Sequence, residues 1–384
     1  MSNVEKLTIG IDGSRNRSGG AVAHLVGILT EGDPIKSGIG TVHVWAYKKL
    51  LDQIPNRDWL VKHNTAELEG SMLAQLWWQR FKFPGEIELS KCQIVLNTDA
   101  GTVARVRPAV TMSRDMLSYE PGEMDRYGLS LGRLRLIFLR HMQNRSLRES
   151  DAAIFLTQYA SSTIQQSCGS LPHISHIPHG VGPSFVASTQ RSSWPETKDD
   201  PIRCVYVSNA ELYKHQWNVI YAIKRLRQLG YNLTLTLIGG GAGRAQEMLD
   251  TAKYEVDSEG IFIEQLEFIP QQELPDQIAM SDLFIFASSC ENMPNTLVEG
   301  MAMGMPIACS NRGPMPEVLS DGGVYFDPED VCSISSAIEQ LIQFPEKRLE
   351  ISKRAKVLSS QYSWSRCARE TFELLRETFV RVAN

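Results

Sequence analysis

The sequence lacks long apolar runs and paired cysteines. None of its apolar stretches approaches the roughly 20 residues that a membrane-spanning helix needs, and the first one, Leu7–Ile11, is also too short for a secretory signal. The seven cysteines include no Cys-x-x-Cys pair and no Cys/His cluster, which disfavours a disulfide framework and a structural zinc site. We therefore expect a cytoplasmic protein without a bound metal.

A dense stripe of positive charge is also missing. The net charge is −5, with 20 Lys/Arg against 17 Asp/Glu in residues 1–185 and 19 against 27 in the remainder. Nucleic acid is therefore not an expected partner. The mildly basic first half would suit an acceptor that carries phosphate, or an acidic membrane surface, but an ordinary charge fluctuation between two domains explains it equally well.

The length of 384 residues and the apolar content of 42% are sufficient for two domains, each with its own core. Ile202–Val207 predicts a buried strand that begins the second domain. The polar, proline-bearing segment Ser192–Pro201 before it predicts a linker. We place the N-terminal acceptor-side domain at 1–190, the C-terminal nucleotide-sugar domain at 191–360, and a C-terminal helix that returns to the first domain at 361–384.

Residues 282–306 predict a strand, a loop and a helix, followed by another strand. The apolar run Asp282–Ala287 is typical of a parallel strand buried on both faces, and Pro306–Ser310 predicts the next strand. Between them we expect Asn295 to be the N-cap of a helix. Such a loop lies at the carboxyl end of the sheet, where α/β proteins bind ligands and the first amides of a helix attract anions. This pattern predicts a phosphate site at Asn295, Thr296 and Leu297.

Two glutamates bracket the predicted phosphate site. Glu291 lies in the loop and Glu299 lies one turn into the helix. Because a carboxylate repels phosphate, Glu299 is better suited to accept hydrogen bonds from neutral hydroxyls, such as a ribose diol. Glu291 can reach past the phosphate to a sugar. The alternative is that both are solvated surface residues.

The two glutamates and the residues after them carry a family resemblance. Glu291 and Glu299, with seven residues between them, are followed by Gly300-Met-Ala-Met-Gly-Met-Pro-Ile. This arrangement resembles the signature of the retaining nucleotide-sugar glycosyltransferases of the GT-B fold, of the family 4 type found in bacterial surface-glycan biosynthesis. The resemblance implies an α/β protein with two Rossmann-like domains that face each other across a cleft.

The resemblance also implies roles for individual residues. Glu299 would hold the ribose, and the amides of Asn295–Leu297 would hold the distal phosphate. Glu291 would contact the donor sugar near its reacting carbon, as a catalytic residue. Phe268 and Ile269 would meet the nucleotide base through their backbone.

The residues expected to contact the diphosphate match the family pattern only in part. The family commonly has Gly-Arg at a strand end, where this sequence has Ser208 and Asn209, and a lysine some five residues later, which Lys214 matches. Gly19 and Gly20 match the glycine loop of the first domain, which faces the diphosphate in this family. We expect Lys214 to be the second catalytic residue, because a cation there would stabilise the departing diphosphate.

On the acceptor side the sequence departs from the family. Many members carry a histidine near the position where this chain has Arg114 and Asp115. The acceptor-side candidates are therefore Asp99, Arg114 and Asp115. The identity of any base that activates the acceptor stays open between Asp99, Asp115 and His141.

Two further segments allow more than one interpretation. Residues 66–83 carry apolar and aromatic side chains at helical spacing and precede Pro84, so we expect a helix that packs into the core. The alternative is contact with lipid through its Trp and Phe side chains, beside Arg80 and Lys82. Gly128–Leu147 predicts a helix. Its four arginines and Arg148 directly after it do not share one face, which favours a solvated helix.

The sequence therefore predicts a retaining, metal-independent hexosyltransferase. Its donor would be a UDP-sugar or, as a second option, a GDP-sugar, and its acceptor a lipid-linked or growing bacterial glycan such as lipopolysaccharide O-antigen or capsule. The alternatives are a sugar-nucleotide epimerase of the same fold and a catalytically idle partner protein that binds sugar nucleotides. Peripheral contact with the inner face of the cytoplasmic membrane is left open.

Overall fold

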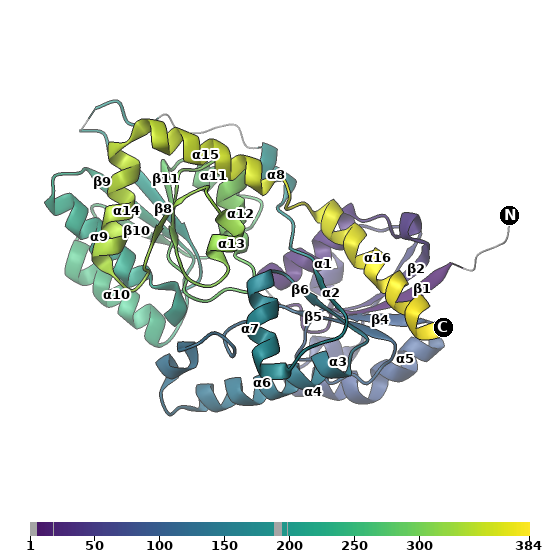
Figure 1. The fold of residues 1–384 in the computed structure, drawn as a ribbon. Coiled ribbons are helices and arrows are strands. Elements are labelled where there is room, and N and C mark those ends of the chain that lie inside the picture. Colours follow the sequence, from purple (N-terminus) through teal and green to yellow (C-terminus); the bar gives the residue numbers. More distant parts are fainter. Residues whose placement is uncertain (1–5, 18, 188–193, 198) are drawn as a thin grey trace. The chain divides into compact units, whose positions relative to one another are not determined.

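The computed structural model describes residues 6–17, 19–187, 194–197 and 199–384 and divides into two compact units (Figure 1). The N-terminal unit comprises Met1–Gly180 with Tyr362–Asn384, and the C-terminal unit comprises Val181–Gln361. Three positions of the predicted linker, 192, 193 and 198, lie outside the described residues, as does the predicted boundary at 190.

The N-terminal unit is built on a parallel seven-stranded sheet with the order β3-β2-β1-β4-β5-β6-β7. Its central strands are almost wholly buried, as expected for a sheet covered by helices on both faces. The strands are β1 (Leu7–Asp12), β2 (Ile39–Trp45), β3 (Leu60–His63), β4 (Ile94–Asn97), β5 (Ala109–Ser113), β6 (Ala152–Phe155) and β7 (Ile174–His176).

Helices of several types surround this sheet. The last helix of the chain packs against the first one, so both ends of the chain contribute to this unit. The helices are α1 (Gly19–Glu31), η1 (Pro34–Ser37), α2 (Lys48–Leu51), α3 (Ala66–Glu69), α4 (Met72–Trp77), the π-helix η2 (Trp78–Lys82), α5 (Phe83–Leu89), η3 (Glu123–Tyr127), α6 (Leu131–Glu149), α7 (Gln158–Cys168) and α16 (Trp364–Ala383).

The prediction of one helix over residues 66–83 was wrong. The segment consists of α3, α4 and the π-helix η2, and Pro84 lies in the first turn of α5. Because η2 runs directly into α5, Pro84, which has no amide hydrogen, lies where the π-helical hydrogen-bond pattern changes to the α-helical one. The helix predicted at Gly128–Leu147 is present as α6, which begins after Ser130, whose side chain accepts a hydrogen bond from the amide of Arg133.

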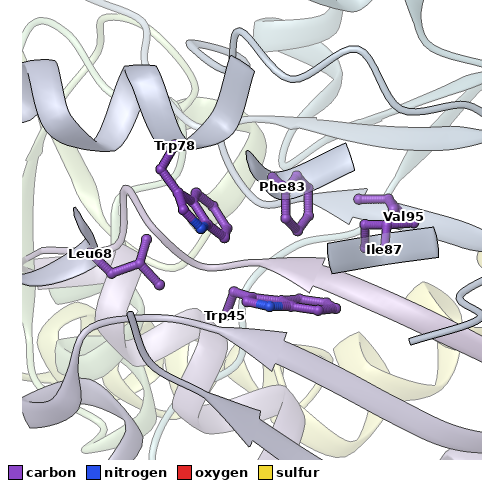
Figure 2. Close-up of a cluster of buried hydrophobic side chains, with 6 residues drawn as sticks. All are labelled: Trp45, Leu68, Trp78, Phe83, Ile87 and Val95. Atoms are coloured by element: carbon purple, nitrogen blue, oxygen red, sulfur yellow. The ribbon is translucent and has the colours of Figure 1, made fainter. Parts of the chain in front are cut away.

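One face of the segment 66–89 does form core. Figure 2 shows Leu68, Trp78, Phe83 and Ile87 gathered around Trp45 of β2. The rings of Trp45 and Phe83 meet edge to face, with their centroids 5.3 Å apart, a geometry that aromatic pairs favour. The predicted packing into the core is therefore confirmed for this face of the segment.

The C-terminal unit contains a parallel six-stranded sheet with the order β10-β9-β8-β11-β12-β13. The strands are β8 (Ile202–Val207), β9 (Leu233–Ile238), β10 (Ile263–Leu266), β11 (Leu283–Phe286), β12 (Ile307–Ser310) and β13 (Val324–Phe326). The helices are α8 (Pro183–Ala187), η4 (Leu212–Lys214), α9 (Gln216–Gln228), α10 (Arg244–Asp257), α11 (Leu274–Ala279), α12 (Asn295–Ala302), α13 (Met315–Leu319), α14 (Val331–Gln343) and α15 (Pro345–Ser359).

Two parallel-sheet α/β units confirm the predicted fold class. In each sheet the strand order reverses direction beside the first strand, β1 or β8, and ligands bind at such reversal points in open α/β sheets. Among the described residues, no helix is both long and apolar enough to cross a membrane.

Candidate functional site

The candidate site of the C-terminal unit lies at the carboxyl ends of β8 and β11, the two strands beside its reversal point. Hydrogen bonds of Ser289 help to join the loops that follow these strands. The amide of Ser289 donates to the carbonyl of Tyr213 at 2.8 Å, and the Ser289 hydroxyl lies 2.9 Å from Nε2 of His215. These bonds hold residues 211–216 against residues 287–294.

Lys214 and Glu291 form an ion pair between the two loops. Their side chains are only 9% and 14% exposed, so the alternative of a solvated loop glutamate is wrong for Glu291. Lys214 ends the short helix η4 and does not belong to α9, which starts after His215 has adopted a left-handed backbone (φ 48°). The ammonium group also lies 5.2 Å from the ring centroid of Tyr213. The structure thus brings the two predicted catalytic residues into direct contact.

Glu299 is buried in α12, so the alternative of a surface position is wrong for it as well. One carboxylate oxygen, Oε1, accepts a hydrogen bond from Nε2 of Gln271 at 3.3 Å. The other, Oε2, is buried and has no hydrogen-bond partner among the described residues. Burial raises the pKa of Glu299 to about 8, although the bond from Gln271 opposes the rise. This carboxyl group can therefore accept a further hydrogen bond from a ligand.

The start of α12 differs from the prediction in one detail. Asn295 is the first residue of the helix, and the preceding residue is Pro294, which offers no capping side chain. The hydroxyl of Thr296 donates to the carbonyl of Val207 at 3.2 Å, which joins the helix start to the end of β8. The first-turn amides have no intrahelical acceptors, so Thr296 and Leu297 are placed where an anion would be bound.

The remaining predicted donor residues lie on neighbouring loops. Ser208 is buried, and its amide donates to the carbonyl of Ile238 at 2.9 Å, whereas Asn209 is exposed. Phe268, which is exposed, and Ile269 lie in the loop after β10. The same loop supplies Gln271, the partner of Glu299.

The acceptor-side candidates lie in the N-terminal unit, at the ends of β4 and β5. Arg114 forms an ion pair with Asp99 at 3.2 Å and donates to Oδ1 of Asn16 at 3.0 Å. Its Nε and Nη1 atoms are buried without a partner in the described part of the chain, and burial lowers its pKa. Asp115 is separately held by the amide of Leu117, and burial raises its pKa.

A polar network beside these candidates was missed by sequence reasoning. Asp12, the last residue of β1, accepts hydrogen bonds from the Ser14 hydroxyl at 2.6 Å and from Nε2 of Gln79 at 2.6 Å. Burial raises the pKa of Asp12. The hydroxyl of Thr98 donates to Oδ1 of Asn16 at 2.8 Å. A search for polar residues directly after each predicted strand would have found most of this network.

Gly19 and Gly20 are the first two residues of α1 in the N-terminal unit, and Gly19 has a positive φ of 52°.

Across the residues that the structure describes, no group of three or more His, Cys, Asp or Glu side chains could hold a metal ion.

The two parallel-sheet units define the protein as one of the GT-B fold, the class of its solved structural neighbours. Sucrose-phosphate synthase from Thermosynechococcus elongatus superposes with a TM-score of 0.76 at 14% identity, covering 98% of this chain and 100% of that one. Anabaena Alr3699/HepE in complex with UDP and glucose superposes with a TM-score of 0.67 at 18% identity, covering 98% and 99%.

Sequence comparison finds a family match over part of the chain. Residues 188–358 match the family described as glycosyl transferases group 1. The match covers less than half of the chain and falls within the C-terminal unit. The O-antigen chain mannosyltransferase B of Escherichia coli is 34% identical over 110 residues, which span 29% of this chain and 29% of that relative.

Proposed function

We propose that the protein is a group 1 glycosyltransferase that moves a sugar from a nucleotide-diphosphate sugar to a glycan, with retention of configuration. The observation that carries this proposal is the arrangement around residues 287–302. The Lys214–Glu291 ion pair lies before the start of α12, and Glu299, with its unpartnered oxygen, lies one turn inside the helix. The family match covers all three residues.

In this proposal Glu299 binds the nucleotide ribose. A diol can donate a hydrogen bond to Oε2, the buried oxygen without a partner in the described residues, and the gain is large because an unsatisfied buried acceptor is costly. The first-turn amides of α12 then hold the distal phosphate. A UDP-sugar is the favoured donor, supported by the UDP complex of the Anabaena neighbour, and a GDP-sugar is the second option.

The ion pair supplies the proposed chemistry. When the diphosphate enters, Lys214 can exchange its bond to Glu291 for bonds to phosphate oxygens, where it stabilises the negative charge that grows as the sugar departs. Glu291, released from Lys214, then places its negative charge beside the oxocarbenium-like sugar. Because a cation and helix amides neutralise the diphosphate in this scheme, it needs no metal. Gly19 and Gly20 would add amide contacts.

The proposed acceptor is a lipid-linked or growing bacterial glycan such as O-antigen. The O-antigen mannosyltransferase of E. coli supports this choice. Asp99 is preferred over Asp115 as the acceptor-activating base, because its side chain is 28% exposed, whereas Asp115 is held in the interior by Leu117 and Gln143. His141, which is exposed on α6, stays a further candidate. The enzyme would work in the cytoplasm, at the inner face of the membrane.

The test begins with a thermal-shift screen of nucleotide diphosphates and their sugars, followed by mass spectrometry of the products. Transfer, or slow release of free sugar with the expected anomeric configuration, supports the proposal. Conversion of the donor to an isomeric nucleotide sugar would identify an epimerase instead. Binding without any turnover would identify an idle sugar-nucleotide-binding protein.

Variants test the roles of the two glutamates. We expect Glu299→Ala to weaken nucleotide binding and Glu291→Gln to lower turnover with little change in nucleotide affinity. Glu350→Gln, an exposed position on α15, is the matched control. Equal loss of nucleotide affinity in both site variants would contradict the separate roles. Activity that survives exhaustive chelation is expected, and rescue of a chelated enzyme by magnesium or manganese would refute metal independence.

A further inference from the structure

Two helical segments of the N-terminal unit expose large apolar side chains. In α4 and η2 the outward face carries Leu73, which is 77% exposed, and the aromatic residues Trp77 and Phe81. In α6 the outward positions include Leu134 and Phe138, which are 63% and 64% exposed. The opposite side of η2 carries Trp78, which belongs to the cluster of Figure 2, and α6 buries Leu136 and Leu147. Both segments are therefore anchored on one side and apolar toward solvent on the other.

A cavity of about 550 Å³ lies between these two segments. Arg80 of η2 lines one side of it, Met142 and Arg145 of α6 line another, and the loop 102–107 contributes Arg105 and Arg107. Met142 follows Phe138 by four residues, so the exposed apolar stripe of α6 leads along the helix to the cavity. Glu149 also lines the cavity and pairs with Arg145. The four lining arginines outnumber it, and arginines at a cavity wall favour a phosphate ligand.

The cavity also offers a hydrogen-bond acceptor. Asn97, at the end of β4, lines the cavity and is 6% exposed. Its Nδ2 donates to the Thr111 hydroxyl at 3.1 Å, while its Oδ1 is buried without a partner among the described residues. A ligand with hydroxyl groups would satisfy this oxygen. Together, the arginines and Asn97 suit a phosphate ester of a polyol.

The segments around the cavity carry mostly positive charge. The segments 72–82, 102–107 and 131–149 contain nine Arg/Lys and one acidic residue, Glu149, in a chain whose net charge is −5. Four of the nine form ion pairs, with Glu67, Asp125, Glu149 and Asp151, and exposed pairs of this kind are weak. Positive charge therefore remains in excess on this face.

We propose that these three segments form a docking face for an anionic phospholipid bilayer, with a phospho-polyol head group in the cavity. Aromatic residues beside basic ones, on a helix anchored by its other face, match the requirements of the bilayer interface, and the positive excess matches anionic lipid. A second copy of this chain would bring positive charge against positive charge. This inference deepens the proposed function, because it places the enzyme where a lipid-linked acceptor resides.

Vesicle co-sedimentation of the full chain tests the docking face. We expect binding to vesicles of phosphatidylglycerol and phosphatidylcholine at low salt, weaker binding at high salt, and little binding to phosphatidylcholine alone. Arg105→Gln with Arg145→Gln, and separately Trp77→Ser with Phe138→Ser, should each weaken binding by about tenfold or more. A wild-type chain that stays in the supernatant with phosphatidylglycerol vesicles would overturn the proposal.

Matched controls lie on α15 of the C-terminal unit. Lys347→Gln with Lys353→Gln removes two exposed charges, and Leu349→Ser with Val357→Ser removes two apolar side chains of similar exposure. Both control pairs should bind vesicles like the wild type, and an equal loss in them would contradict the assigned face. Thermal stabilisation by glycerol phosphate without any vesicle binding would assign the cavity to a soluble phosphate ester and refute the membrane.

The same samples separate this inference from the proposed function. Vesicle binding without nucleotide binding keeps the docking face and removes the glycosyltransferase proposal. Nucleotide binding and sugar transfer without vesicle binding would keep the glycosyltransferase proposal and refute the docking face.

Discussion

The Lys214–Glu291 ion pair combines a structural and a proposed catalytic role in two residues. Both side chains are largely buried, and removing one partner of a buried pair leaves an uncompensated charge, which costs about 3 kcal/mol. We therefore expect Lys214→Ala to lower the unfolding free energy by about that amount and turnover by at least about tenfold. Denaturant unfolding and steady-state kinetics measure the two effects.

The matched control for Lys214 is Lys347→Ala on the exposed face of α15, where both effects should be negligible. Unchanged kinetics in Lys214→Ala would show that another group neutralises the diphosphate. Unchanged stability would mean that the Glu291 carboxylate becomes hydrated when Lys214 is removed.

Glu299 predicts a dependence of stability on pH in the ligand-free protein. Its pKa in the folded protein, about 8, lies above the ordinary value of 4.5 because the carboxyl group is buried. The unfolded chain therefore releases the proton first, and the contribution of Glu299 to stability is lost as the pH rises from 4.5 to about 8. Glu299→Gln removes this loss, so its stability relative to wild type should rise by up to about 1.4 kcal/mol per pH unit in this window.

Thermal melts of Glu299→Gln and wild type across this pH window provide the measurement, with Glu350→Gln as the exposed control. A constant difference between Glu299→Gln and wild type at all pH values would show that the Glu299 carboxyl is not buried in solution.

At the residue scale, the sequence placed the proposed donor residues near the ends of strands and helices but gave no information on their contacts. Glu291 and Glu299 were selected from the strand–loop–helix pattern, and Lys214 was selected from the family resemblance. Their partners are distant in sequence: Lys214 and Glu291 are 77 residues apart, and Asp12 and Gln79 are 67 residues apart. Contacts of this kind depend on the order of the strands in the sheet, which the spacing of apolar residues in the sequence does not predict.

At the scale of elements, the predicted strands at 202–207, 282–287 and 306–310 are present as β8, β11 and β12, because buried parallel strands are continuous apolar runs. Strands such as β2 and β13 were not predicted. The segment 66–89 was predicted wrongly, because its apolar residues serve two environments. Trp78 and Phe83 point into the core while Trp77 and Phe81 are exposed, and the π-helix η2 lies between α4 and α5. The prediction treated all the aromatic residues as one face of one helix, so it could not distinguish the buried residues from the exposed ones.

Glycine contacts yield a prediction about how α16 is held. A Cβ atom on Gly180 would lie 2.2 Å from the backbone nitrogen of Trp364, the first residue of α16, whereas a Cβ on Gly85, inside α5, meets no described atom within 4 Å. Gly180→Ala should therefore destabilise the N-terminal unit by about 1–3 kcal/mol, and Gly85→Ala should stabilise it by about 0.5–1 kcal/mol.

Thermal melts with far-UV detection measure both glycine variants. A neutral Gly180→Ala would mean that the start of α16 does not pack against residue 180 in solution, and a destabilising Gly85→Ala would mean that α5 is not a regular helix.

At the scale of the molecule, the proposed donor residues are concentrated in one unit. Residues 208–216, 268–271 and 287–302 belong to the C-terminal unit, as does the family match, whereas Asp99, Arg114 and the proposed docking face belong to the N-terminal unit. The two parallel sheets were predictable from apolar runs. The return of the chain to the N-terminal unit through α16 was predicted only from the family resemblance. The helical spacing of apolar residues predicts a buried face but does not say which element packs against it.

This division predicts where the donor nucleotide protects the backbone. A ligand stabilises the segments that bind it, and local opening is measured by amide hydrogen exchange. Saturating UDP should slow exchange most strongly in residues 287–302 and 208–216, with about tenfold slowing for each 1.4 kcal/mol of binding free energy. Residues 131–149 of the docking face should be unaffected by UDP and protected by phosphatidylglycerol vesicles. Protection by UDP centred on 131–149 would contradict the assignment of the donor site, whereas a shared effect of UDP and vesicles on both regions would show that the two sites are coupled.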